Sequence, residues 1–147
     1  MYVSDILAEK GDLVVTIHPD VTLHHAARQL ARFGFGVLVA SENGSSIAGI
    51  ISERDIVRRV AENGPDALTI SVRSVMTRSI HTCAAADTID HVMELMTEHG
   101  FRHVPVVEPG TDGGQLCGMV SITDVVRRRV QELEHARSQL EEYLTAR

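Results

Sequence analysis

Two stretches of the chain carry the same helical spacing of apolar residues, at i, i+3, i+4 and i+7. The residues that form it are Leu23, Ala26, Ala27 and Leu30 in the first stretch and Ile89, Val92, Met93 and Met96 in the second. A threonine suited to N-cap a helix precedes each stretch, at Thr22 and Thr88, and a glycine that can end a helix follows it, at Gly34 and Gly100. Each stretch is therefore predicted to be an amphipathic helix with one buried face.

Short β-rich runs surround both helices. They lie at 14–17, 37–40 and 47–51 in the first half of the chain and at 80–83, 103–107 and 116–120 in the second. Turn-forming residues join the last two runs of each half, at 43–46 and 109–114, which is typical of hairpins. A further helix is expected after Ser52 and after Ser121, so each half has the order β-α-β-β-α.

The two halves are copies of one unit. At an offset of 66 residues, Thr16, Thr22, His25, Gly34 and Phe35 recur as Thr82, Thr88, His91, Gly100 and Phe101. At an offset of 69, six of the eleven residues in 49–59 are identical to those in 118–128. Because one copy alone exposes much apolar surface, we expect the two to pack around a pseudo-twofold axis. The expected α/β (α+β) fold has a first repeat at 1–62, a linker at 63–71, a second repeat at 72–130 and a C-terminal helix at 131–147.

Composition narrows the class of protein. The 147 residues are 44% hydrophobic and 23% charged, which favours a folded globular protein over a disordered one. A net charge of −6 argues against a general nucleic-acid binder, and no apolar run is long enough to predict a membrane helix. Two cysteines are too few for a disulfide framework, so we expect reduced thiols and a cytoplasmic location.

Three motifs resemble those of one known family. A Gly-hydrophobic-hydrophobic-Ser-x-x-Asp segment occurs at 49–55 and 118–124, Val-Met-Thr opens the second copy at 75–77, and Phe-Arg-His-Val-Pro-Val-Val occupies 101–107. The chain resembles a tandem pair of cystathionine β-synthase (CBS) domains over nearly its whole length. The resemblance implies a regulatory module, not an enzyme, that binds an adenosine-containing ligand (AMP, ATP, NAD(H) or S-adenosylmethionine) in clefts between the copies. It also implies a homodimer that acts on an unidentified regulated protein.

The ribose of such a ligand presents a cis-diol, for which a carboxylate is a suitable acceptor. The candidates are Asp55 and Asp124, and the resemblance places the ribose-binding acid of the family at both positions. Ser52, Ser121 and Thr123 add hydroxyls at the same predicted helix starts, where backbone N–H groups favour anions. A serine followed three residues later by an acid is also a helix-capping arrangement, and the two roles can coexist.

The phosphate candidates lie in the second copy. Arg102 offers paired donors with a permanent charge, and His103 is a candidate to assist it; the alternatives are a solvated arginine and a structural histidine. The first copy has Gly36 at the position of Arg102, and Arg54 is the candidate to substitute there. We therefore expect unequal clefts. The one better suited to a phosphorylated ligand is expected to contain Arg102, Thr123 and Asp124.

Two weaker assignments remain open. The resemblance places Thr16 and Thr82 near the adenine base, although ordinary β propensity also explains both. His81 and Cys83 lie on one face of a predicted strand and are both types of zinc ligand, but no further residues complete a tetrahedral set. Core or surface roles are therefore the favoured interpretation of this pair.

The C-terminal segment is expected to be one continuous helix with a short heptad pattern. Its apolar positions are Val126, Val130, Leu133, Leu140 and Leu144, with Arg137 as a polar member of the same stripe. The stripe packs either on the body of its own chain or on a partner, and we expect it to contribute to a homodimer. A structural dimerisation module without functional ligand binding is therefore the alternative to a ligand sensor.

Overall fold

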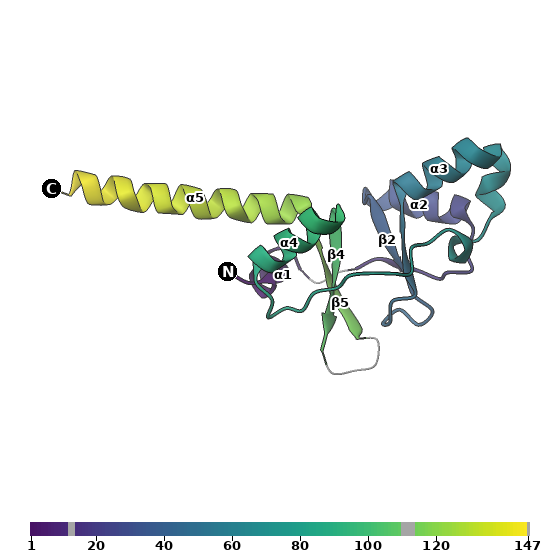
Figure 1. Ribbon diagram of the computed structural model, residues 1–147, viewed down its shortest axis with the longest axis horizontal. Helices are drawn as coiled ribbons and strands as arrows, with labels where there is room; N and C mark the ends of the chain where they lie inside the picture. The colour runs from purple at the N-terminus through teal and green to yellow at the C-terminus, as the bar shows by residue number, and fades with distance from the viewer. Residues whose placement is uncertain (12–13, 110–113, 147) are drawn as a thin grey trace.

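The protein consists of two units of mixed helix and strand that lie side by side, with one long helix projecting from the second (Figure 1). The computed structural model describes residues 1–11, 14–109 and 114–146. The first unit contains β1 (Thr16–Ile17), α2 (Leu23–Phe33), β2 (Val37–Ala40), β3 (Gly49–Ser52) and α3 (Glu53–Asn63). Strand β2 is the centre of its sheet, because β1 pairs with it in parallel and β3 pairs with it antiparallel.

The second unit repeats this order with one change. It contains α4 (Ile89–His99), β4 (His103–Glu108), β5 (Gln115–Ser121) and α5 (Ile122–Thr145), and β4 pairs antiparallel with β5. The strand expected at 80–83 is reduced to an isolated parallel bridge between Cys83 and Val106. Pro105 has no N–H to donate toward the residues before Cys83, so the pairing cannot extend in that direction.

The helix boundaries follow from their caps, as predicted. The Thr22 and Thr88 hydroxyls accept hydrogen bonds from the backbone N–H groups of His25 and His91, at 3.2 and 3.1 Å. At the other ends Gly34 and Gly100 adopt φ values of 70° and 71°, a left-handed conformation that glycine enters at low cost. These matching ends confirm that α2 and α4 are equivalent helices of the two repeats.

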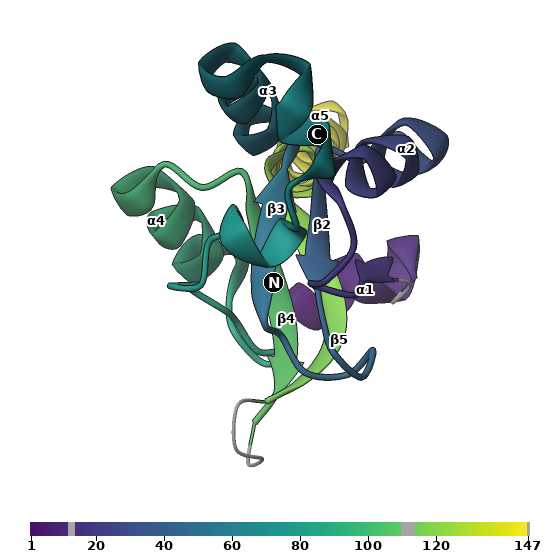
Figure 2. The same cartoon turned by 90° about the vertical axis from the view of Figure 1, so that its right-hand side faces the viewer.

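The opening segment of each repeat packs on the core of the other repeat. Helix α1 (Val3–Lys10) contributes Val3 and Ile6 to the core built around α4, β4 and β5. The corresponding segment of the second repeat, which includes η2 (Val72–Ser74), contributes Val72 and Met76 to the core of the first. Viewed end-on in Figure 2, the strands of both units lie at the centre with the helices around them. This exchange joins the two repeats into one structural body.

The remaining elements are a short connection and the projecting helix. Residues after α3 form η1 (Gly64–Thr69), which leads into the second repeat. Helix α5 continues without a break from Ile122 to Thr145, and its distal half extends away from both units (Figure 1). The side chains of Leu133 and Leu140 are 70% and 59% exposed there. In the described residues, no helix combines the length and the apolar composition that crossing a membrane requires.

Candidate functional site

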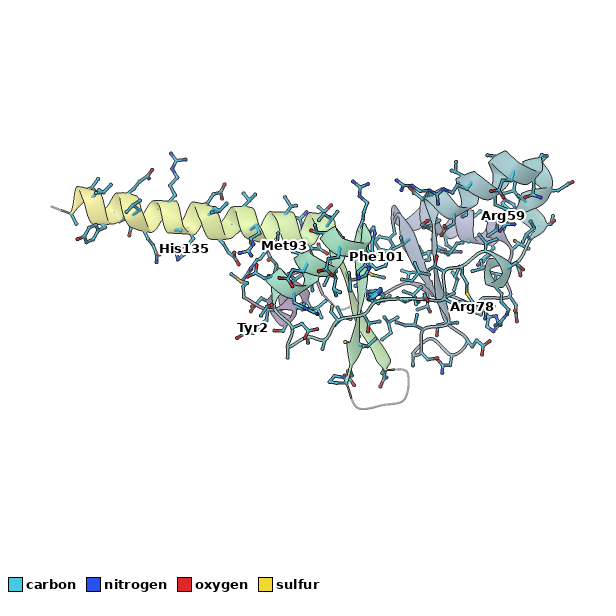
Figure 3. The ribbon with its side chains drawn as sticks, in the orientation of Figure 1. Tyr2, Arg59, Arg78, Met93, Phe101 and His135 are labelled. Atoms are coloured by element: carbon cyan, nitrogen blue, oxygen red, sulfur yellow. The ribbon has the colours of Figure 1, made fainter. Side chains whose placement is uncertain are left out.

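A cavity of about 370 Å³ lies where the two repeats meet. Its wall includes Gly36, Ser52, Arg54 and Asp55 from the first repeat, and Thr77, Ser79, His81, Phe101, Arg102 and His103 from the second. Thr77 fixes one side of this wall, because its backbone forms a two-way antiparallel bridge with Ile50 of β3. Figure 3 shows Phe101 at the boundary between the two units. Both repeats therefore supply polar side chains to one space.

The cavity brings together half of the residues that the sequence suggested. Those that line it are Ser52, Arg54, Asp55, Arg102 and His103. Those outside its wall are Thr16, Thr82, Ser121, Thr123 and Asp124: Thr16 pairs with Val39 in β1, Thr82 is exposed, and the other three begin α5. Arg102 was expected to share a cleft with Thr123 and Asp124, whereas the cavity places it with Asp55. Asp55 of the first repeat and Arg102, which lies just before β4 of the second repeat, thus line the same cavity.

Asp55 is held at the start of α3 by a capping box. Its carboxylate accepts a hydrogen bond from the Ser52 N–H at 2.8 Å, and the Ser52 hydroxyl accepts one from the Asp55 N–H at 3.1 Å. The capping interpretation is therefore correct, and it also fixes the carboxylate at the cavity wall. Within the described residues, no basic side chain lies within ion-pair distance of Asp55. The carboxylate keeps free acceptor capacity for a ligand hydroxyl.

Gly36 and His103 lie next to each other in the cavity wall. A Cβ atom on Gly36 would lie 3.8 Å from the His103 imidazole carbon Cε1, which is an ordinary van der Waals contact. Burial lowers the pKa of His103 below its ordinary value, and the charges of Lys10 and Arg102 act in the same direction against the opposing effect of Asp124. The imidazole is therefore neutral in the folded protein at neutral pH.

The lowered pKa of His103 predicts a loss of stability in mild acid. The unfolded imidazole takes up its proton near its ordinary pKa of about 6.5, whereas the folded one resists protonation, so the free energy of unfolding falls as pH drops below about 6.5. We expect His103→Asn to flatten this part of the profile, measured by urea unfolding between about pH 7 and 5. The matched control is His135→Asn on the projecting helix, which should keep the wild-type slope; equal slopes in all three proteins would contradict the assignment.

An aromatic cluster borders the cavity and was not predicted. The rings of His81 and His99 stack with centroids 4.1 Å apart, and Phe101 lies 5.4 Å from each of them. His81 and Phe101 line the cavity, so the cluster offers flat ring surface to it. His81 therefore has a role in this stack, and in the described residues no group of three or more His, Cys, Asp or Glu side chains is placed to hold a metal ion. The one feature of the sequence that could have pointed to this cluster is the recurrence of Phe35 as Phe101 in the second repeat.

Comparisons with known proteins agree with this architecture. A family model described as CBS domain matches residues 3–62 and 72–131. The CBS-domain containing protein ATU1752 from Agrobacterium tumefaciens is 41% identical, with a TM-score of 0.81 over 87% of this chain and 92% of that chain. The CBS domain-containing protein CBSX3, mitochondrial, from Arabidopsis thaliana is 31% identical over 97% of this chain and 71% of its own length. Because that relative is named as mitochondrial, a cytoplasmic location for this chain stays a prediction.

Two further structures contain adenosine compounds. The CBS domain protein PAE2072 from Pyrobaculum aerophilum, complexed with AMP, is 28% identical with a TM-score of 0.78 over 93% of this chain and 99% of that chain. The CBS domain pair of MJ0100, in complex with 5-methylthioadenosine and S-adenosyl-L-methionine, is 27% identical with a TM-score of 0.77 over 90% and 98%.

The match to curated relatives is partial in length. The chain spans 66%, 71% and 57% of the first three of them. The two family matches nevertheless cover both repeats, and each matched range contains most of one of the two hydrophobic cores. The chain therefore belongs to the CBS-domain family and contains two CBS domains in tandem.

Proposed function

We propose that the cavity binds an adenosine nucleotide of the AMP, ATP or NAD(H) type and that the protein is a non-catalytic, ligand-sensing regulatory module. The observation that carries this proposal is that the Asp55 carboxylate, which has no ion-pair partner among the described residues, lines one cavity with the Arg54 and Arg102 side chains. The carboxylate suits a ribose diol, and the guanidinium groups suit a phosphate. The AMP complex of PAE2072 and the S-adenosylmethionine complex of MJ0100 support an adenosine ligand.

The size and lining of the cavity fit a single nucleotide. Its volume of about 370 Å³ lies within the range of roughly 300–1,000 Å³ that is usual for small-molecule sites. Val37 and Ile50 add apolar surface to the wall beside the rings of Phe101 and His81. The lining thus offers apolar contacts to a flat base and charged partners to the phosphate and ribose of the ligand.

Thermal unfolding of nucleotide-stripped protein tests the proposal, with adenosine, AMP, ATP, NAD, NADH and S-adenosylmethionine as probes. A ligand at 100 times its dissociation constant stabilises the folded state by about 2.7 kcal/mol, which for a domain of this size raises Tm by roughly 5–10 °C. A shift of this size with a phosphorylated adenosine compound is the expected result. The absence of a shift with every probe would contradict nucleotide sensing and favour the structural dimerisation module.

The phosphate assignment makes a separate prediction for Arg102. We expect Arg102→Ala to lose most of the stabilisation by AMP while keeping the smaller stabilisation by adenosine, because only the phosphate needs the guanidinium group. The matched control is Arg32→Ala, which removes an exposed arginine outside the cavity wall. Equal losses for AMP and adenosine would show that Arg102 shapes the cavity without contacting phosphate.

We also propose that the protein is a homodimer held in part by the projecting half of α5. The exposed apolar residues at the heptad positions of α5 are Val126, Val130, Leu133, Leu140 and Leu144, and the last two lie in its distal half. They are exposed to solvent in the single chain, so of the two alternatives that the sequence left open a partner helix is favoured. A second copy presents the same stripe, which makes a self-complementary helix pair possible. Ligand-dependent contact with a separate regulated protein is part of the same proposal.

A further inference from the structure

Asp124, the counterpart of Asp55, already has a cation bound to it. The Lys10 ammonium donates a hydrogen bond to the Asp124 carboxylate oxygen Oδ2 at 2.8 Å and another to the Met119 carbonyl at 2.9 Å. The same carboxylate oxygen accepts the Ser121 N–H at 2.9 Å, and the Arg127 guanidinium lies 4.0 Å from the other oxygen, Oδ1. The Asp124 side chain is 10% exposed. Both of its oxygens therefore face positive charge in a largely buried position.

Helix α1 holds Lys10 in this place by contacts at several points. The Leu7 side chain fills the space above Gly118, where a Cβ atom would lie 2.7 Å from a Leu7 methyl carbon. Two residues later, the Glu9 carboxylate forms an ion pair with Arg128 of α5 at 3.3 Å. Lys10 is the last residue of α1, where a cation also interacts favourably with the helix dipole. The ion pair is thus supported by the packing of α1 on the second unit.

The first repeat has no equivalent cation. Gly49 and Gly118 are equivalent at an offset of 69 residues, and they are covered by Met76 and Leu7, which are equivalent at the same offset. The same offset places Ser79 opposite Lys10, and Ser79 lines the cavity beside Asp55. Similarly, Arg58 is the counterpart of Arg127, and within the described residues it forms no ion pair with Asp55. A short hydroxyl in one repeat therefore stands where the other repeat has an ammonium.

Displacing Lys10 from Asp124 carries a free-energy cost that a ribose does not recover. Neutral hydroxyls would replace a charged donor on a largely buried carboxylate, and a charged donor makes the stronger hydrogen bond. Burial raises the pKa of Asp124. The hydrogen bonds from Lys10 and Ser121 and the charge of Lys10 together outweigh this effect, so the pKa lies below its ordinary value. The carboxylate is therefore ionised and paired with Lys10 at neutral pH.

We propose that Lys10 is an internal cation that closes the Asp124 position to ribose, so that each chain binds one nucleotide, at Asp55. This inference rests on the proposed nucleotide function of the cavity and adds its stoichiometry. Lys10 is then a specificity-determining residue, since it decides which of two equivalent carboxylates is available. Replacement of Lys10 by serine, the residue found at the equivalent position 79, should make the Asp124 position more like the Asp55 position.

Isothermal titration with AMP tests this stoichiometry. We expect one site per chain in the wild-type protein and two in Lys10→Ser. The affinity of the original site for AMP should change by no more than about twofold, as is usual for a substitution at a distant position. Lys10→Gln is the second variant, because its amide can still donate to the Met119 carbonyl while the charge is removed. Arg28→Ser is the matched control; it removes one positive charge from an exposed residue of α2 and should keep one site.

The outcomes separate this inference from the function on which it rests. Addition of Asp124→Asn to Lys10→Ser should return the stoichiometry to one, which assigns the new site to Asp124. One site in the wild type and in both Lys10 variants, with wild-type Tm values, overturns the inference and leaves the function standing. Two sites in the wild type overturn the inference as well. Weaker AMP binding at unchanged stoichiometry in Lys10→Ser would make Lys10 a phosphate contact and would also contradict it, whereas no AMP binding in the wild type rejects the proposed function itself.

Discussion

Replacement of Asp55 by asparagine is expected to weaken AMP binding by about 10- to 100-fold, because hydrogen bonds to a charged group contribute about 1.5–3 kcal/mol and 1.4 kcal/mol corresponds to tenfold in affinity. The change removes the charge that attracts the ribose hydroxyls but keeps a side-chain oxygen that can accept the Ser52 N–H. The helix cap is thereby largely preserved. Isothermal titration of nucleotide-stripped protein measures the effect, with Tm as a check on folding.

The repeat supplies a matched control for this substitution. Asp124 occupies the same capping box at the start of α5, so Asp124→Asn makes the same chemical change at the equivalent position. Because Asp124 lies outside the cavity wall, we expect the affinity of the wild-type site for AMP to be retained. A larger loss of AMP affinity in Asp124→Asn than in Asp55→Asn would show that the ribose binds at Asp124, and it would contradict our proposal.

The second large effect is expected from charges placed in the stripe of α5. We expect Leu133→Asp combined with Leu140→Asp to convert a homodimer into a monomer of about 16 kDa, because the helix pair would have to bury unpaired carboxylates from both chains, two from each. In the described structure both leucines are more than half exposed, so their loss removes little packing within one chain. Light scattering coupled to size-exclusion chromatography measures the mass, and circular dichroism reports whether the helix persists.

A control pair on the opposite side of the same helix separates this effect from a change in net charge. His135 and Ser138 lie outside the heptad positions, and Figure 3 shows His135 on the projecting part of α5. We expect His135→Asp combined with Ser138→Asp to remain dimeric. A monomeric wild type, or a leucine double variant that keeps the wild-type mass, would show that this stripe does not hold the dimer.

Elements with local signals were predictable from the sequence. Thr22 and Gly34 bound α2 through hydrogen bonds and a φ value that depend only on neighbouring residues. The antiparallel pairs β2–β3 and β4–β5 followed from runs of β-forming residues, and β2 coincides with the predicted run at 37–40; most of the turn predicted at 109–114 lies outside the described residues. The β-α-β-β-α order was likewise predictable from the internal repeat, although in the second repeat its first strand is reduced to the Cys83–Val106 bridge.

Features that depend on contacts between distant residues were not predictable. Helix α1 was missed although Val3, Ile6 and Leu7 have helical spacing, because its apolar residues are few and its partners lie in the other repeat. The Lys10–Asp124 pair joins residues 114 positions apart, and no local pattern marks it. For the same reason, the sequence identified Asp55 and Arg102 as candidates but did not show that they line one cavity.

A crystal structure of nucleotide-stripped protein soaked with AMP examines the assignment of the cavity most directly. We expect AMP between the two repeats, with its ribose hydroxyls about 2.6–3.2 Å from the Asp55 carboxylate, its phosphate at Arg54 or Arg102, and the Lys10–Asp124 ion pair intact. AMP bound at Asp124 with the Asp55 cavity empty, or no AMP bound between the repeats, would contradict it.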